Sequence, residues 1–402
     1  MTPEVEIPYG QYWSTPFCKW QGAFQHLHSL EFAVFVAKQE LARRRLPLEL
    51  LDYAVLGTTI PQHHSFYGLP WLTGLLGVPA LTGPTLSQAC ATSARCVAAA
   101  TQEIQSGAAS AALIVTCDRT SNGPHLYYPA PHRPGGTGEH EDWVMDNFGC
   151  DPLAGHSMLA TAENVAREYA ISTAEQHDVV LRRHEQYENA LEDDRAFQRR
   201  FMTLPFEVPD PRFRRTTATL EGDEGVYPST AEKLEALEPV LADGSVTFAA
   251  QTHPADGNAG LVVAAPDVAR RMSADENIVC RIAGFGQARV DLAHMPKATV
   301  PAAQCALEHS GIGLDQLKAI NSHNPFALND IVFSRETGAD LSRMNNYGCS
   351  LVWGHPQGPT GLRAIIELIE ELVLVGGGYG LFYGCAAGDS AMAVVLEVSD
   401  RR

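Results

Sequence analysis

The sequence predicts an α/β protein in which helices cover β-sheets and the chain forms two similar halves. Helical and strand-like segments alternate in residues 1–120 and again in residues 278–402, a pattern typical of sheets covered by helices. Each region has a reactive residue, Cys90 or His355, at a loop-to-helix junction, followed by a helix, a glycine stop and an apolar strand. The chain has 402 residues, 45% of them hydrophobic, which is ample material for a large core.

The first half begins with a helix expected at residues 30–45, where apolar side chains recur at helical spacing and the end is basic. A short buried strand is expected within 51–59. An Ala-rich helix follows at 91–106, ended by Gly107, and then a strand at 111–116. Because nearly all residues of 91–106 are small, we expect this helix to be packed on every side.

The middle of the chain differs from both halves in composition and pattern. Residues 158–194 form a charged helical segment between irregular stretches that are rich in Gly and Pro. We therefore expect a loop domain inserted between two core halves, with domains at 1–120, 121–250 and 251–402.

The second half contains a helix, a turn and a strand within residues 301–324. The stretch "SLVWGHPQGPTGLRAII" then predicts a buried strand, a turn at 354–356 and a helix start, before a glycine stop and two further strands. Placing a titratable ring on a turn next to a buried segment costs free energy, so such a ring is expected where it has a function. His355 is therefore a candidate functional residue.

Composition excludes several classes of function. The formal net charge of −18 argues against nucleic acid or an anionic membrane as the main partner. No apolar run is long enough to span a membrane, and the first residues do not resemble a secretory signal. Nine cysteines without a Cys-x-x-Cys pair argue against a zinc finger or a disulfide framework. We expect a reducing, cytoplasmic setting and no metal site.

Cys90 and His355 are candidates for nucleophilic catalysis. Cys90 stands just before a helix, where free backbone N–H groups and the macrodipole favour an anion and lower the pKa of a thiol. A nucleophilic thiol also needs a base, which His355 can supply from its turn. The structural alternatives are a small buried thiol, as expected for Cys96, and an imidazole bonded to a loop carbonyl.

His323 and Cys385 are two further candidates. His323 ends an apolar strand and is followed by Asn324 and Pro325, an arrangement typical of a site edge in α/β proteins. Cys385 lies in a Gly/Ala-rich bend between strand segments, where adjacent N–H groups can form an oxyanion pocket. An ordinary strand-end turn and a packed core thiol are the alternatives.

These blocks together resemble a known family. "CATS", "HNPF", "GHPQGPTG" and "GLFYGCAAG", in this order and spacing, resemble the active-site loops of the thiolases, which comprise acetyl-CoA acetyltransferases and 3-ketoacyl-CoA thiolases. Residues 158–186 are similar to the family's loop domain, and 244–263 to the segment leading back into the core. The resemblance implies a five-layered α-β-α-β-α fold with two βαβαβ-type halves and an inserted loop domain.

The resemblance also implies an activity and roles for residues. The chain would be an acyl-CoA C-acyltransferase that makes or breaks a carbon–carbon bond in a 3-ketoacyl-CoA through an acyl group on Cys90. His355 would activate this thiol, and Cys385 would be the acid/base. The backbone N–H groups of Cys90 and Ala387 would hold an oxyanion. Residues matching the pantetheine tunnel are Met158, Thr252, Met295 and Phe326.

The partners implied are CoA and acyl-CoA as substrates, with no tightly bound cofactor, and a second copy of the chain in a homodimer or dimer of dimers. Some thiolase-like subunits act with a small OB-fold partner, and this alternative stays open. The basic cluster Arg212, Arg214 and Arg215 can meet the nucleotide phosphates of CoA or form a solvated turn.

Two departures from the family pattern concern the substrate. "HNPF" replaces the usual Asn-Glu-Ala-Phe, and a His here resembles sterol-carrier-type thiolases and Cys-His-His ketoacyl synthases. An N–H of His323 can still stabilise an enolate oxygen. Ala387 replaces a usual glycine and adds a methyl group to the acyl pocket. A decarboxylating condensing enzyme, a non-catalytic subunit and a Cys/His metal site are the competing interpretations. The acyl group and the direction of flux stay open.

Overall fold

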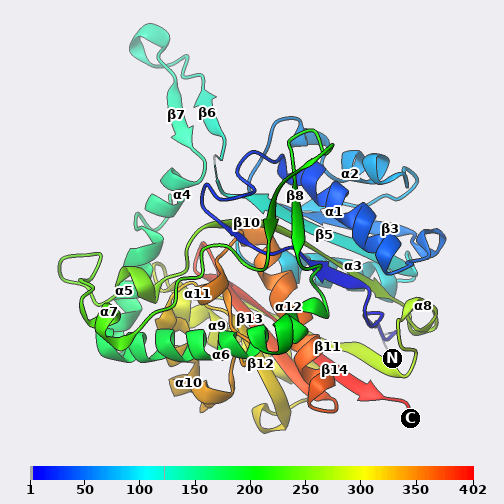
Figure 1. The fold of residues 1–402 in the computed structure, drawn as a ribbon. Helices are drawn as coiled ribbons and strands as arrows, with labels where there is room; N and C mark the ends of the chain where they lie inside the picture. The colour runs from blue at the N-terminus through cyan, green and yellow to red at the C-terminus, as the bar shows by residue number, and fades with distance from the viewer. Residues whose placement is uncertain (1–2, 122) are drawn as a thin grey trace.

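A computed structural model describes residues 3–121 and 123–402 (Figure 1). Its first sheet has the order β1-β10-β5-β3-β4, and β2 also pairs with β10. β3 runs parallel to β4 and β5, whereas β10 is antiparallel to β1, β2 and β5. The strands are β1 (Tyr12–Ser14), β2 (Cys18–Lys19), β3 (Tyr53–Gly57), β4 (Thr85–Leu86), β5 (Ala111–Arg119) and β10 (Ala255–Ala264).

The second sheet has the order β11-β14-β13-β12. β11 and β12 are the edge strands; β12 is parallel to β13, while β14 is antiparallel to both β11 and β13. The bounds are β11 (Ile278–Arg289), β12 (Leu317–His323), β13 (Gly378–Ala386) and β14 (Ser390–Asp400). Its central strands are almost wholly buried, as expected for apolar runs covered on both faces.

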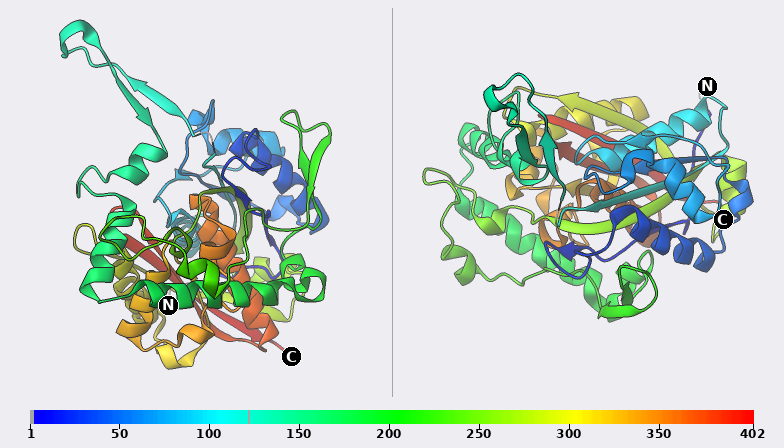
Figure 2. Two further views of the ribbon diagram at one scale, coloured as in Figure 1. Left: turned by 60° about the vertical axis from the view of Figure 1, so that its left-hand side comes forward. Right: turned by 90° about the horizontal axis from the view of Figure 1, so that it is seen from above.

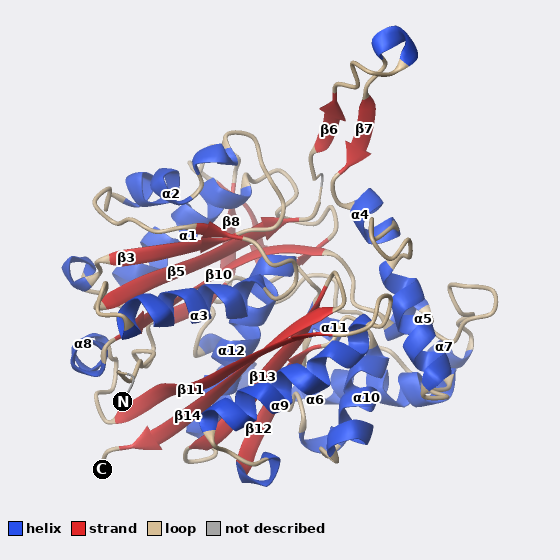
Figure 3. Cartoon of the chain, turned by 180° about the vertical axis from the view of Figure 1, so that it is seen from behind, coloured by secondary structure: helices blue, strands red, loops and turns tan. Residues whose placement is uncertain are grey.

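Helices complete five layers, which confirms the fold class expected from the resemblance (Figure 3). α3 (Thr92–Gln105) and α12 (Gln357–Leu374) pack against each other between the two sheets. α1 (Ser29–Arg43) and α2 (Leu69–Leu76) cover the outer face of the first sheet. α9 (Thr299–Ser310) covers the outer face of the second, with α10 (Ala327–Thr337) beside it.

The two interior helices approach each other closely at their starts. A Cβ atom built at Gly361 of α12 would lie 3.0 Å from Cβ of Ser93 on α3, so a larger residue would push the helices apart. The Ser93 hydroxyl also donates to the carbonyl of Gly358. Further along α12, the buried Arg363 pairs with Asp223 at 2.6 Å, which anchors the helix to the middle segment of the chain. The helix starts from the two halves therefore meet in the interior.

The middle segment carries the remaining elements. The β6–β7 hairpin projects away from the body of the protein (Figures 1 and 2). The long helix α6 packs against α10 and α11, while the β8–β9 hairpin lies near α1. These elements are β6 (His125–Tyr128), β7 (Glu139–Asp142), α4 (Met145–Gly149), α5 (Met158–Glu168), α6 (Thr173–Arg199), β8 (Phe206–Pro209), β9 (Thr216–Leu220) and α7 (Ala231–Glu235). Two short helices lie outside this segment, α8 (Pro266–Met272) and α11 (Ser350–Trp353).

The structure differs from the sequence-based expectations in three places. β10 lies after residue 251 but pairs within the first sheet, so the second sheet begins only at β11. Residues 350–353 form the helical turn α11 instead of the expected strand, and this turn packs mainly on α6. α3 is buried along much of its length, yet Gln102 is exposed, so the helix is not enclosed on every side.

Among the described residues, no helix is both long enough and apolar enough to cross a membrane.

Candidate active site

Cys90 lies on a tight turn that leads into α3. Ala89, just before it, has φ 44°, a left-handed conformation that costs a non-glycine residue roughly 1–2 kcal/mol. Thr92 stabilises the turn: its hydroxyl accepts from the Gln88 N–H at 2.8 Å and donates to the Ala89 carbonyl at 2.7 Å. No side chain caps the helix start. The turn places the Cys90 sulfur within reach of the backbone N–H groups of Cys90 and Ala387.

His355 reaches this thiol from the start of α12. Its Nε2 lies 3.1 Å from Cys90 Sγ, and its Nδ1 lies 2.7 Å from the Thr360 hydroxyl. When Nδ1 carries the ring hydrogen and donates it to Thr360, Nε2 is free to accept the thiol proton. Gly354 precedes the ring with φ 91°, and a Cβ there would lie 2.7 Å from the His253 ring, so the turn requires glycine.

His323 stacks on His355. Their ring centroids are 4.0 Å apart with an interplanar angle of 26°. His323 ends β12, is fully buried, and its Nδ1 lies 2.9 Å from the Ser350 hydroxyl. Within the described residues, its other nitrogen, Nε2, has no hydrogen-bond partner. The donor atoms of Cys90, His323 and His355 all lie within 4.8 Å of one another. The three residues that sequence motifs suggested are thus one cluster.

Cys385 supplies a second sulfur from β13. The side chain is fully buried, and the Asn329 amide donates to its Sγ at 3.3 Å. The residue lies within the strand, one position before its end, and the bend expected around it begins at Ala387. Asn329 comes from α10, so β13 and α10 together fix this thiol.

Electrostatics differ from the sequence-based expectation at Cys90. Burial raises the pKa of this thiol to about 12, even though hydrogen bonds from the backbone N–H groups of Ala387 and Cys90 lower it. Desolvation therefore outweighs the helix start, and the predicted lowering was wrong. Burial also raises the pKa of Cys385 well above its usual value. It lowers the pKa of His323 to about 3. Burial, together with His323 and His253, lowers the pKa of His355 well below its usual value. The cluster rests with neutral thiols and neutral imidazoles.

The four residues matched to the pantetheine tunnel come from elements that pack together. The short turn beginning at Met295 contacts α5, α10 and β13, and Met158 is the first residue of α5. Thr252 N–H donates to the Pro325 carbonyl at 2.7 Å, next to Phe326.

Arg214 and Arg215 lie elsewhere. They belong to the β8–β9 hairpin and line a hollow together with Phe35 and other residues of α1. The backbone N–H of Arg214 donates to Asp210 at 2.8 Å, and the Arg215 side chain is largely exposed. The structure does not bring this pair into the group around Met295.

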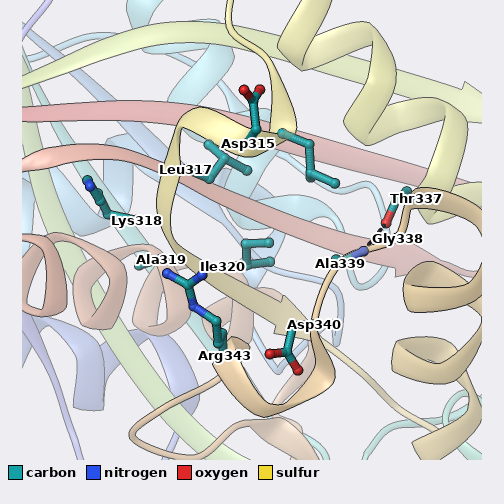
Figure 4. A pocket seen from close by; sticks show the side chains of 11 residues that line it. Asp315, Leu317, Lys318, Ala319, Ile320, Thr337, Gly338, Ala339, Asp340 and Arg343 are labelled. Atoms are coloured by element: carbon teal, nitrogen blue, oxygen red, sulfur yellow. Dashed lines mark hydrogen bonds between the residues drawn. The ribbon is translucent and has the colours of Figure 1, made fainter.

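A hollow on the edge of the second sheet is also separate from the cluster. Figure 4 shows Asp315, Lys318, Asp340 and Arg343 around it, beside β12 and the turn after α10. None of the candidate site residues lines it.

Three polar residues of the cluster were missed by the sequence analysis. Thr360 and Ser350 each bind the Nδ1 of one imidazole, and each lies five positions from His355. Asn329 binds Cys385. The fixed spacing around the Gly-His-Pro turn could have pointed to the first two, but nothing in the sequence singles out Asn329.

Comparisons with known proteins point to one family. The family model described as "Thiolase, N-terminal domain" matches residues 12–267, and "Thiolase, C-terminal domain" matches residues 276–398. Similar curated proteins include the beta-ketothiolase BktB of Cupriavidus necator, 26% identical over 99% of this chain and 100% of that protein. Human mitochondrial 3-ketoacyl-CoA thiolase is 26% identical, covering 95% of this chain and 96% of its own.

Solved structures give the same result. The crystal structure of the Bacillus anthracis acetyl-CoA acetyltransferase matches with a TM-score of 0.88 at 26% identity, covering 99% of both chains. Human mitochondrial 3-ketoacyl-CoA thiolase matches with the same TM-score of 0.88 at 23% identity, over 99% of this chain and 100% of that one. With the family models spanning almost its full length, the chain belongs to the thiolase family of acyl-CoA acyltransferases.

Proposed function

We propose that the chain makes or breaks the carbon–carbon bond of a 3-ketoacyl-CoA, with Cys90 carrying the acyl group between two half-reactions. The observation that supports this most directly is the 3.1 Å contact between Cys90 Sγ and His355 Nε2. A neutral thiol with a raised pKa needs a base at hydrogen-bond distance, and the neutral imidazole supplies it.

In the degradative direction, Cys90 Sγ gives its proton to His355 and attacks the 3-keto carbon. The bond between C2 and C3 breaks, and its electron pair leaves as the enolate of acetyl-CoA. The N–H groups of Cys90 and Ala387, which already reach the sulfur, are well placed for the oxyanion that forms at the attacked carbonyl.

Cys385 returns a proton to C2 of the enolate and releases acetyl-CoA. The Asn329 amide donates to its sulfur and so stabilises the thiolate that remains. His323 faces the enolate oxygen as the hydrogen-bond donor. Free CoA then takes the acyl group from Cys90. Claisen condensation is the same sequence in reverse, with the Cys385 thiolate removing the α-proton.

CoA binding is proposed to involve Met158, Thr252, Met295 and Phe326 around the pantetheine. Met295 and Phe326 are buried and apolar, which suits the walls of a narrow tunnel. Arg214 and Arg215 remain a weaker proposal for the phosphates, because they lie beside α1. No tightly bound cofactor is proposed.

A decarboxylating condensing enzyme is the second candidate. The stacked pair His323 and His355 beside Cys90 favours it, since such chemistry uses two imidazoles. Cys385, held by Asn329, favours the thiolase reaction, because decarboxylation forms the enolate without a proton-abstracting thiol.

The deciding experiment uses purified protein with acetyl-CoA or malonyl-CoA as the carbon nucleophile, and separately a panel of 3-ketoacyl-CoAs of different chain length with free CoA. Loss of the 3-ketoacyl thioester together with formation of acetyl-CoA supports the thiolase reaction. Condensation from malonyl-CoA alone supports the second candidate. An inert preparation that becomes active only with a co-expressed OB-fold protein would support the partner-dependent form.

We also propose a homodimer or dimer of dimers in a cytoplasmic setting. Phe66 is 93% exposed and Tyr67 71% exposed in the loop after β3, an apolar surface that a second copy can cover. Sedimentation analysis of the purified chain tests this, and a monomer at micromolar concentration contradicts it.

A further inference from the structure

The proposed role of His323 requires one tautomer of its ring. A neutral imidazole carries one hydrogen, on Nδ1 or on Nε2, and the other nitrogen is an acceptor. Stabilising an enolate oxygen needs the hydrogen on Nε2, the nitrogen that is buried without a partner beside Cys90 and His355. Nδ1 must then accept a hydrogen bond from elsewhere.

Ser350 is the residue placed to donate that bond. Its Oγ lies 2.9 Å from His323 Nδ1, and both side chains are fully buried, so water does not compete at this position. Ser350 is the first residue of α11, five positions before His355, so the same turn orients both imidazoles.

The surroundings of the Ser350 oxygen limit where its hydrogen can point. The backbone N–H of Asn324 donates to this oxygen at 3.2 Å and occupies one lone pair. Two acceptors remain for the hydroxyl hydrogen: His323 Nδ1 at 2.9 Å and Asn324 Oδ1 at 3.4 Å. Hydrogen bonds weaken steeply toward 3.5 Å, and an imidazole nitrogen is a strong acceptor. The geometry favours donation to His323.

Asn324 cannot turn to reverse this preference. Its amide nitrogen donates to Asp330 at 2.7 Å, and Asp330 in turn is held by the buried Arg183 at 2.8 Å. A carboxylate paired with arginine accepts only, so the amide nitrogen stays on that side and its oxygen stays toward Ser350. The network therefore keeps the distances around Ser350 fixed.

We propose that Ser350 is a positioning residue that holds His323 in the Nε2–H tautomer, so that the ring donates a hydrogen bond into the acyl site. The hydroxyl acts only through the ring and does not touch the reacting atoms. This inference rests on the proposed function for its kinetic consequence, but the tautomer itself is a property of the resting protein.

The first test is the ¹⁵N NMR spectrum of the histidine-labelled protein, with the His323 signals assigned by loss in His323→Asn. In the wild type we expect hydrogen on Nε2 and an unprotonated, hydrogen-bonded Nδ1. In Ser350→Ala we expect a mixture of tautomers or a shift to Nδ1–H. A wild-type ring with hydrogen on Nδ1 overturns the proposal, whatever the enzyme does with CoA esters.

The second test separates the two half-reactions in Ser350→Ala. We expect the carbon–carbon step to slow about 10- to 100-fold, as for other residues that orient a catalytic imidazole, while acetyl transfer to Cys90 stays within about threefold. Ser350→Thr restores the hydroxyl and should recover most of the loss. Ser334→Ala, which removes a part-buried hydrogen bond from a hydroxyl on α10 to the Ala339 carbonyl just after that helix, is the control and should change neither step.

Equal slowing of both steps in Ser350→Ala, with an unchanged ¹⁵N spectrum, would show a merely structural role. If Ser350→Ala does not fold, the wild-type spectrum decides. If the wild type shows the Nε2–H tautomer but no carbon–carbon chemistry, the proposed function fails and the role of Ser350 stands.

Discussion

The two thiols of the site, Cys90 and Cys385, are equally neutral at rest but face opposite partners. The sulfur of Cys90 meets a ring nitrogen that accepts a proton, 3.1 Å away. The sulfur of Cys385 meets an amide that donates one, 3.3 Å away. Burial raises the pKa of both, so neither is a standing thiolate. The difference in partner, rather than in acidity, is the basis for the proposed roles of the first thiol in nucleophilic attack and of the second in proton transfer.

The largest effect is expected when the sulfur of Cys90 is removed, which tests the proposed difference between the two thiols most directly. In Cys90→Ala we expect turnover to fall by about 10⁴-fold or more, since removing a nucleophile eliminates the covalent route. Intact-protein mass spectrometry after incubation with acetyl-CoA should show no acetylated enzyme. Cys96→Ala, which removes a buried thiol about one turn into α3, is the control and should still be labelled. Labelling of Cys90→Ala would falsify the assignment.

Removing the second sulfur should divide the half-reactions. In Cys385→Ala we expect the carbon–carbon step to fall about 10²- to 10⁴-fold, the usual contribution of a general acid/base, while Cys90 is still acylated. Mass spectrometry measures acylation, and exchange of the acetyl-CoA methyl protons in heavy water measures proton abstraction. Loss of acylation in this variant, with its fold intact, would contradict the division of roles.

Zinc should distinguish the two thiols directly. Of the cysteines in the part of the chain that the structure describes, only Cys90 has two imidazoles whose ligand atoms lie within 4.8 Å of its sulfur and of one another, a donor set that suits Zn²⁺. We expect micromolar Zn²⁺ to inhibit reversibly, EDTA to restore activity, and EDTA-treated enzyme to be fully active. His323→Asn should weaken inhibition about tenfold or more, as removal of one of three ligands does. Enzyme that loses activity in EDTA alone would instead support a metal-dependent reaction.

The dependence of the free energy of unfolding on pH in the acidic range should reveal that the imidazoles are neutral in the folded protein. His323 has a folded pKa of about 3 against an unfolded value near 6.5, so between these values the unfolded chain binds the proton and the folded chain does not. The free energy of unfolding is therefore retained above pH 6.5 and falls as pH drops below it, by about 1 kcal/mol per pH unit for this ring. Urea unfolding at pH 7, 6 and 5 measures this, and His323→Asn should flatten the slope. An unchanged slope in that variant would mean that the ring is already charged in the folded protein.

Much of the fold was predictable because its signals are local. The alternation of segments, the Gly-His-Pro turn and the cysteine before α3 are readable in short windows, and they led to the two halves and the correct family. The prediction of a strand at residues 350–353 was wrong because a run of four residues, Ser, Leu, Val and Trp, is too short to show a helical period. Its helical form depends on packing against α6.

The parts of the site that could not be predicted depend on three-dimensional packing. The position of Cys90 before a helix predicted a thiol with a lowered pKa. The residues next to Cys90 in the sequence do not show how deeply the sulfur is buried, and burial raises its pKa instead. Asn329 reaches Cys385 from a different element, with no motif around it. Likewise, the sequence of Asp210–Arg215 shows a basic cluster but not that its hairpin lies beside α1.

The contact between α3 and α12 has a consequence for how the site forms when the chain folds. The two interior helices pack directly against each other, where Ser93 of α3 contacts Gly358 and Gly361 of α12. Neither half can form the pair of Cys90 and His355 alone, because the sulfur belongs to one half and the ring to the other. The proposed site is therefore complete only once both portions of the chain have packed against each other.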